Sequence, residues 1–218
     1  MPTRRAESED SDREYASKEY WESRYKRKLD PSDGEQADRK RPAGEPSSEE
    51  TDEWFFNYAN VEFLLHAYCL NRRSKEEVSL LDVGCGNSPF LIDMRKDGWS
   101  GRAAACDFSL MALKAFEQKC QDAKVPTAWK DSTRPAKQLI KLVECDCRRL
   151  LDYFPRPVDI IIDKGTMDAM YVCAHAHTDN QCPNVVFDKS CTGFFIGCRK
   201  RTRTDDSKVC ANISLRYA

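Results

Sequence analysis

The chain has 218 residues, enough for one domain of ordinary size with some residues left over. Its 35 lysines and arginines nearly balance 36 aspartates and glutamates, and a net charge of −1 provides no overall field that would recruit nucleic acid or an anionic membrane. A charged fraction of 33% and a mean hydropathy of −0.70 are too polar for a chain that is core throughout, so we expect part of it to be solvated.

The N-terminal part of the chain divides into three segments of different composition. Residues 1–14 are acidic and polar, and we expect them to be disordered. Residues 15–28 are compatible with a helix in which Trp21 and Tyr25 share a face. This spacing favours an amphipathic helix that packs on the domain; the alternative is a lid whose aromatic side chains close over a ligand. Residues 29–52 are rich in Pro, Gly, Ser and charge, and we expect a polar linker.

Residues 53–172 carry the regular pattern of a core domain. It opens with a predicted helix over 54–70, for which Thr51 or Asp52 is the expected cap. Apolar runs then alternate with helical stretches, which predicts an α/β fold with a doubly wound, mostly parallel sheet. The expected elements are strands over 78–83, 102–106, 139–145 and 158–162, helices over 89–97 and from the cap Ser109 onward, and a polar stretch over 121–137.

The first predicted strand runs directly into a glycine loop. Gly84 and Gly86 follow Leu80–Val83, and a Gly-x-Gly turn lets the backbone bend sharply and approach a ligand that a Cβ would block. Pro89 suits the first position of the next helix. Asp107 ends the second predicted strand, 21 residues after Gly86. This spacing favours a nucleoside-type ligand with its ribose on the carboxylate; a plain strand-to-helix turn is the alternative.

Three carboxylates fall at or just after the ends of different predicted strands: Asp107, Asp146 and Asp163. Ligands of an open parallel sheet bind outside the carboxyl ends of the strands, so we expect these side chains to line one crevice. Each of them could instead cap the next helix or turn, which is a common role of aspartate. Three in register favour a site.

These motifs resemble those of the class I S-adenosylmethionine-dependent methyltransferases, and more narrowly the branch that methylates lysines of a translation elongation factor. The combination of the glycine loop with the segment DKGTMDA is specific to that branch. The resemblance covers residues 15–171, interrupted by 29–52 and by extra residues near 121–138. The matching pieces are Tyr20-Trp21 with Arg24-Tyr25, Trp54-Phe55, the loop 82–88, Asp107-Phe108-Ser109, Asp146, and DKGTMDA at 163–169.

The resemblance implies that the core binds S-adenosyl-L-methionine. Gly84 and Gly86 would let the methionine part of this cofactor lie against the backbone. Asp107 would accept hydrogen bonds from both ribose hydroxyls, and Phe108 would lie against the adenine. The sulfonium of the cofactor is a cation, which aromatic faces and carboxylates favour.

Further roles implied by the resemblance fall on residues of other segments. Asp146, with the backbone at Cys147, would hold the adenine amino edge. Lys164 would lie beside the cofactor; a solvated loop lysine is the alternative. Asp163 is the expected catalytic carboxylate, which would position the substrate amine. The expected lid over the cofactor consists of Tyr15, Trp21 and Tyr25.

The regular pattern ends after residue 172, where the family would continue with a helix and further strands. Residues 173–218 form an irregular, Cys-rich tail in which only 185–187 and 194–196 suit short strands. We therefore expect a sheet of four strands that lacks its C-terminal strands and leaves an edge uncovered. No Cys-x-x-Cys pair supports a metal, so we expect no zinc on the tail candidates His175, His177, Cys182, Cys191 and Cys198.

The chain shows neither a membrane-spanning run nor a signal peptide. No apolar run approaches the ~20 residues of a membrane helix, and the first residues lack the apolar segment of a secretory signal. We therefore expect a cytoplasmic protein without a membrane partner. Of its 11 cysteines, we expect those beside predicted strands to be reduced thiols that pack as small apolar residues: Cys85, Cys106, Cys145 and Cys147.

Two hypotheses from different classes follow. The first is an S-adenosylmethionine-dependent methyltransferase that modifies a protein lysine, with an elongation-factor-like substrate, a monomeric state and no nucleic-acid partner. The second is a truncated, catalytically inactive module that binds the cofactor or a partner, because the later strands of the sheet are not recognised. A nicotinamide-dependent oxidoreductase is disfavoured, since Pro89 occupies the position of the third glycine in the dinucleotide fingerprint.

Overall fold

The computed structural model describes residues 17–30, 56–69, 74–130, 138–167, 169 and 194–197. Predictions on other positions lie outside the described residues. They concern the segment 1–14, Tyr15, the linker from residue 31 on, the cap at Thr51 or Asp52, Trp54 and Phe55, the strand candidate 185–187, and the histidines and cysteines of the tail. Among the helices that are described, none has the length and apolar character needed to cross a membrane.

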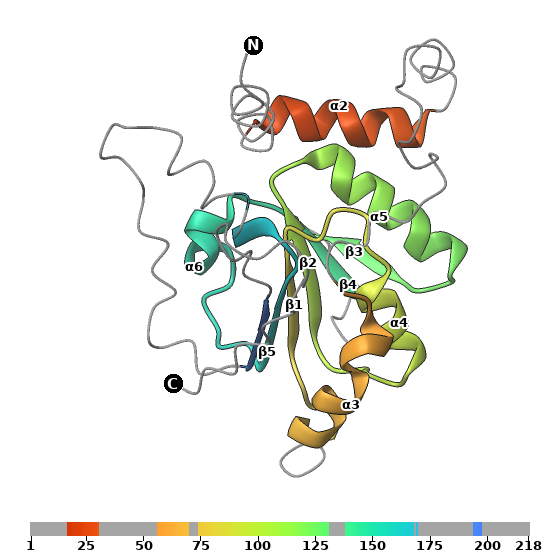
Figure 1. Cartoon of the computed structure of the whole chain (residues 1–218), viewed down its shortest axis with the longest axis vertical. Helices are drawn as coiled ribbons and strands as arrows, with labels where there is room; N and C mark the ends of the chain where they lie inside the picture. Colours follow the sequence, from red (N-terminus) through yellow and green to blue (C-terminus); the bar gives the residue numbers. More distant parts are fainter. Residues whose placement is uncertain are drawn as a thin grey trace, which may run out of the picture.

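A parallel sheet of six strands forms the centre of the described fold (Figure 1). Its spatial order is β3-β4-β2-β1-β5-β6, so β1 lies between β2 and β5, and all neighbours run parallel. The strands are β1 (Leu80–Val83), β2 (Ala103–Asp107), β3 (Thr127–Trp129), β4 (Ile140–Glu144), β5 (Ile160–Asp163) and β6 (Phe194–Gly197). The carboxyl ends of these strands therefore meet at one edge of the sheet.

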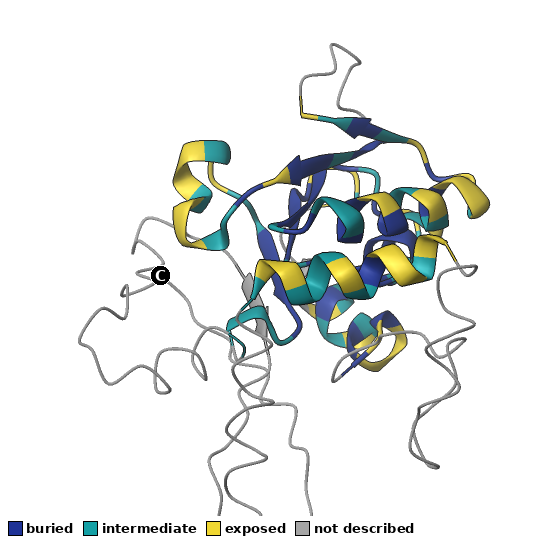
Figure 2. Cartoon of the chain, turned by 90° about the horizontal axis from the view of Figure 1, so that it is seen from above, coloured by how far each residue is buried: buried dark blue, intermediate teal, exposed yellow. Residues whose placement is uncertain are grey.

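Helices cover the two faces of the sheet unequally. The larger core lies under three helices, α3 (Tyr58–Cys69), α4 (Phe90–Lys96) and α5 (Leu110–Asp122). The smaller core on the opposite face lies under η3 (Cys147–Arg149) and α6 (Leu150–Tyr153). Successive strand residues point to opposite faces, so Leu80 joins the larger core and Leu81 the smaller one. Figure 2 shows the central strands buried and the helices exposed on their outer sides.

The predicted α/β fold with a mostly parallel sheet is confirmed, and the four predicted strands correspond to β1, β2, β4 and β5. The expectation of only four strands is wrong. β3 lies inside the polar stretch 121–137. It has three residues, of which only Ala128 is buried, and this is too short to show the alternation of apolar and polar residues that predicts a strand. β6 pairs with β5 at the opposite edge and coincides with the tail segment 194–196, which suited a short strand.

The starts of three helices are fixed by local side chains or by proline. The backbone N–H groups of Asn57 and Asn60 each donate to the side-chain oxygen of the other, at 3.0 and 3.1 Å, where α3 begins. The sequence predicted Pro89 as the first residue of α4. The structure places it one position earlier, as the cap of this helix. Ser109 caps α5 as predicted, and its Oγ accepts from the backbone N–H of Ala112 at 3.1 Å.

The cysteines beside the strands are free thiols, as predicted: Cys85, Cys106, Cys145 and Cys147. Burial raises the pKa of the Cys85 thiol well above its ordinary value, and it raises the pKa of Cys147 to about 12. Both side chains therefore stay neutral at physiological pH and pack as apolar groups.

Candidate functional site

The loop after β1 contains two glycines in the left-handed region, with φ of 61° at Gly84 and 53° at Gly86. Each glycine also faces a side chain from elsewhere in the chain. A Cβ on Gly84 would overlap Thr166 Oγ1 and come within 2.8 Å of its Cβ, while a Cβ on Gly86 would overlap the Tyr25 hydroxyl. Backbone conformation and packing therefore both require glycine at these two positions.

The segment that follows β5 folds back onto the glycine loop. Asp163 Oδ1 accepts from the backbone N–H groups of Thr166 at 2.9 Å and Met167 at 3.3 Å, so this carboxylate caps the turn. Thr166 Oγ1 then donates to the carbonyl of Val83 at 3.0 Å, at the point where β1 enters the loop. The two motifs that carry the family resemblance thus form one structural unit.

Replacing Thr166 tests the hydrogen bond from its hydroxyl to the Val83 carbonyl. Thr166→Val keeps the shape of the side chain but leaves the Val83 carbonyl without its hydroxyl donor, and we expect the free energy of unfolding to fall by about 1–3 kcal/mol. Thr166→Ser keeps the donor and should lose less than ~1 kcal/mol, close to the contribution of one buried methyl group. Urea unfolding measures both variants. If Thr166→Ser lost as much free energy of unfolding as Thr166→Val, the hydrogen bond from the hydroxyl would not be what stabilises the loop.

Two lysines also hold the glycine loop in place. Lys164 is 8% exposed; its Nζ contacts Ser88 Oγ and lies 5.3 Å from the centroid of the Phe90 ring. Interpreting Lys164 as a solvated loop lysine is therefore wrong. From α5, Lys119 Nζ donates to the carbonyl of Asn87 at 2.7 Å. These positive charges lie beside a loop whose neighbours include two buried carboxylates, Asp107 and Asp163.

Asp107, at the end of β2, ties the glycine loop to the start of α5. Its Oδ2 accepts from the backbone N–H of Gly86 at 3.0 Å, and its Oδ1 accepts from that of Ser109 at 2.9 Å. Burial raises the pKa of this carboxyl to about 6, against the opposing effect of the backbone hydrogen bonds. A carboxylate offers roughly four acceptor positions, so two backbone bonds leave capacity for hydroxyl groups of a ligand.

Asp146 lies two residues beyond Glu144, the β4 residue in register with Asp107; it is partly exposed and caps a turn. Its Oδ1 accepts from the backbone N–H of Arg148 at 2.9 Å, and the Arg148 guanidinium binds both carboxylate oxygens. This pairing holds the pKa of Asp146 below its usual value. Asp146 and Asp163 thus each cap a turn.

The aromatic helix α2 (Lys18–Leu29) packs on α5, outside the sheet (Figure 1). Tyr25 is 4% exposed and lies against Ala112 and Ala115, and the Trp21 ring stacks on Tyr25 with centroids 6.0 Å apart. The prediction of an amphipathic helix that packs on the domain is confirmed. The same packing brings Tyr25 to the glycine loop, since its hydroxyl faces Gly86.

The structure brings most of the predicted site residues to one edge of the sheet. Val83 is in register with Cys106 on one side and Asp163 on the other, so the glycine loop, Asp107 and Asp163 end adjacent strands. Sequence reasoning missed the contributions of Thr166, Lys119 and Glu22, whose partners are 83, 32 and 88 residues away in the chain. Of these three residues, only Thr166 lies in a motif, DKGTMDA, that could have indicated its role.

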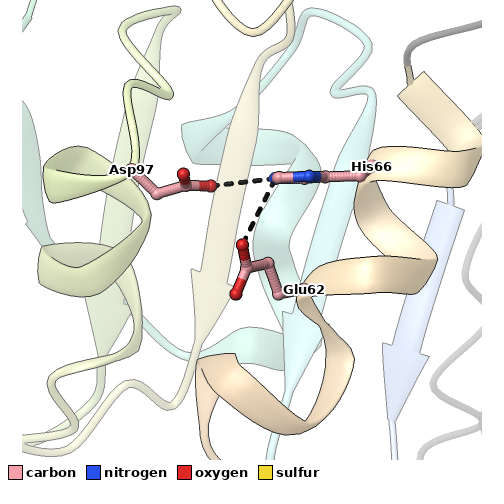
Figure 3. A group of neighbouring side chains, drawn as sticks. All are labelled: Glu62, His66 and Asp97. Carbon is pink, nitrogen blue, oxygen red and sulfur yellow. Dashed lines mark hydrogen bonds and ion pairs between the residues drawn. The ribbon is translucent and has the colours of Figure 1, made fainter.

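A second cluster of polar side chains joins α3 to the end of α4 (Figure 3). Asp97 Oδ2 accepts from His66 Nε2 at 2.9 Å, and Glu62 lies 3.9 Å from the same nitrogen. The arrangement has the residue types of a metal site, but Lys75 Nζ lies 2.7 Å from Asp97 Oδ2 and supplies the positive charge itself. Burial would raise the pKa of Asp97, and the hydrogen bonds from Lys75, Tyr58 and His66 hold it far below the ordinary value. We therefore assign this cluster a structural role.

Comparison with known proteins adds a relative at the level of sequence. No protein-family model matches the chain. It is 29% identical over 126 residues to the mitochondrial citrate synthase-lysine N-methyltransferase CSKMT of Danio rerio, a match that covers 54% of this chain and 46% of the relative. The chain therefore spans about half the length of the curated relative that it matches.

Solved structures give weaker likenesses. Magnesium protoporphyrin IX methyltransferase from Synechocystis, solved with bound S-adenosylhomocysteine, has a TM-score of 0.35 and 15% identity, over 55% of this chain and 49% of that one. An rRNA methylase from Streptococcus thermophilus has a TM-score of 0.33 and 18% identity, over 46% and 52%. At these TM-scores the two structures carry no conclusion about this chain. The sequence relative is therefore the comparison that bears on this chain, and its name describes a lysine methyltransferase.

Proposed function

We propose that this protein is an S-adenosylmethionine-dependent methyltransferase that acts on a protein lysine. The observation that carries the proposal is the joining of the glycine loop, Asp107 and the 163–169 segment at the carboxyl edge of the sheet. The Danio rerio relative, whose name gives a citrate synthase lysine as its target, supports a protein lysine as the methyl acceptor.

The residues at this edge fit the proposed cofactor. Asp107 is buried and keeps acceptor capacity beyond its two backbone bonds, which suits a pair of ribose hydroxyls. Phe108 follows it directly in the sequence and is proposed to lie against the adenine, with Asp146 and the backbone at Cys147 at the amino edge. Trp21, Tyr25, Lys164 and the glycine loop are the proposed neighbours of the remainder of the cofactor. The predicted contact of Tyr15 with the cofactor stays a prediction.

The chemistry divides between the cofactor and the chain. The cofactor supplies a methyl group that is already activated on a sulfonium. The chain must align a neutral amine with it, and alignment of this kind can lower a barrier by several kcal/mol. Free lysine has a pKa of about 10.4, so its amine must lose a proton before attack.

We propose that Asp163 positions the lysine amine. Because this side chain is 1% exposed, the amine would have to enter the site to reach it. A long, thin, unbranched side chain such as lysine meets this requirement, whereas a short side chain on a protein surface does not. The buried carboxylate therefore favours lysine among the nucleophiles that proteins present.

Two measurements on the purified 218-residue chain test the proposal. Titration calorimetry with S-adenosylmethionine should detect binding, and no detectable binding by a folded sample would refute it. Incubation with a purified elongation factor, and separately with citrate synthase, followed by mass spectrometry of lysine-containing peptides, identifies the acceptor. Binding without any methyl transfer would support the alternative, an inactive cofactor-binding module.

Three further expectations belong to this proposal and stay predictions. They are a cytoplasmic location, a monomeric state and the lack of a nucleic-acid partner. Size-exclusion chromatography with light scattering measures the second directly.

A further inference from the structure

The first turn of α5 is held by two acidic side chains from different parts of the chain. From α2, the carboxylate of Glu22 accepts from the backbone N–H groups of Leu110 at 2.7 Å and Met111 at 3.3 Å. The preceding N–H, that of Ser109, donates to Asp107 at 2.9 Å. The first N–H groups of a helix have no partner within the helix, so each of these bonds supplies one.

These bonds are part of a set of contacts that links α5, the glycine loop and α2 to one another. Asp107 joins the start of α5 to Gly86, and Gly86 faces the hydroxyl of Tyr25, which lies on α2 one helical turn after Glu22. Glu22 completes this set by joining α2 to the start of α5. The position of α2 over the glycine loop and the position of Asp107 are therefore set by the same turn of α5.

Glu22 is a stronger polar link for α2 than the surface ion pair of Lys18 with Glu144. Lys18 Nζ lies 2.8 Å from Glu144, but both side chains are nearly half exposed, and such pairs contribute little. Glu22 is half-buried and binds two N–H groups at a helix N-terminus, where the helix dipole also favours a negative charge. The apolar side chains of α2 in the cluster with Ala112 and Ala115 are Tyr25 and Trp21.

We propose that Glu22 is a positioning residue for the cofactor site: it seats α2 on α5 and so holds Tyr25, on which Trp21 stacks, beside the glycine loop. The proposal rests on the function proposed above as far as the cofactor is concerned. Its structural part, the seating of α2, does not depend on any ligand. Glu22 itself acts through the helix that it fixes and need not touch the cofactor.

Three variants of the full chain separate this role from a general effect on folding. Glu22→Ala removes both acceptors. Glu22→Gln keeps an amide oxygen that can accept one bond, and it is the conservative variant. Glu19→Ala is the matched control, because Glu19 lies on the same helix but bonds to Ser17 and, among the described residues, makes no bond to α5.

Hydrogen exchange without cofactor reports the seating of α2. In Glu22→Ala we expect faster exchange of the amides in α2 and of Leu110 and Met111, with unchanged exchange in β1 and β4. Glu22→Gln should be intermediate, and Glu19→Ala should match the unmodified chain. Unchanged exchange at Leu110 and Met111 in Glu22→Ala would overturn the proposal, whatever the cofactor result.

Calorimetry with S-adenosylmethionine then reports the consequence for the site. We expect affinity to fall about tenfold in Glu22→Ala, to be within about threefold of the unmodified chain in Glu22→Gln, and to be unchanged in Glu19→Ala. Equal affinity in Glu22→Ala, with α2 released, would refute the link between α2 and the cofactor. No binding by the unmodified chain would instead refute the proposed function and, with it, the cofactor part of this inference.

Discussion

Replacing Gly84 with alanine is expected to lower the free energy of unfolding by about 2–5 kcal/mol. The backbone at this residue has a φ of 61°, which costs an alanine about 1–2 kcal/mol. The new methyl group would also overlap Thr166 Oγ1 and lie 2.8 Å from Thr166 Cβ and 2.9 Å from Cγ2. Rotation of the Thr166 side chain would move its Oγ1 and Cγ2 but not its Cβ, which is fixed to the backbone, so the 2.8 Å contact would remain.

Gly98→Ala is the matched control for this experiment. Gly98 also has a positive φ, 89°, but nothing lies within 4 Å of the position that its Cβ would take. We expect a loss of only about 1–2 kcal/mol, from the backbone term alone. Urea unfolding of the two variants isolates the steric contribution, and equal losses would show that the packing of Thr166 on Gly84 is unimportant.

The second large effect is expected at Asp107, where acidification should weaken cofactor binding. Burial raises the pKa of this carboxyl to about 6, and the ionised form is the one that accepts hydrogen bonds from ribose hydroxyls. Affinity should therefore be constant above about pH 7 and fall, in the limit, about tenfold per pH unit below 6. Calorimetry with S-adenosylmethionine between pH 5 and 8 measures this dependence.

The stability of the free protein should respond to Asp107 in the opposite direction. A carboxyl whose pKa is raised on folding, from its usual value of about 3.9, contributes stability that is fully present below that value. This contribution is lost as the pH rises through about 6. Between pH 4 and 6 acidification should thus weaken binding while this group adds stability, and parallel changes in both quantities would contradict the assignment.

Asp107→Asn is the variant that tests the same group directly. Asparagine presents an NH₂ group to one of the two backbone donors that the carboxylate binds, at Gly86 and Ser109, and it removes the charge. We expect affinity to fall about 100-fold and its dependence on pH between 5 and 7 to disappear. A variant that kept the full pH dependence would place the titrating group elsewhere.

The sequence predicted those features of the fold that depend on local patterns. Apolar runs gave four strands within a few residues of their observed bounds, and Ser109 was correctly identified as a helix cap. β3 was missed because three residues are too few to establish a period. Its Trp129 is held by a hydrogen bond to Glu117 at 3.0 Å, a contact of tertiary structure.

The candidate site was predicted as a set of residue types at strand ends, and the structure adds how they are joined. Gly84 was expected to make room for a ligand; the structure shows that Thr166 already requires glycine there. Asp146 and Asp163 were expected to line a crevice, and both cap turns. Spacing along the chain indicates which residues reach the sheet edge, but not which of their atoms are already engaged by neighbouring backbone.

The contacts of α2 also bear on the order in which the chain folds. Glu22 binds backbone that lies 88 residues later, so a ribosome releases this helix long before its partners exist. A helix of 12 residues is marginal by itself in water, and it gains stability only through tertiary packing. This helix is synthesised before α5 and is therefore among the last elements to take its final place, and until α5 has folded the aromatic side chains of α2 remain exposed to other proteins and to chaperones.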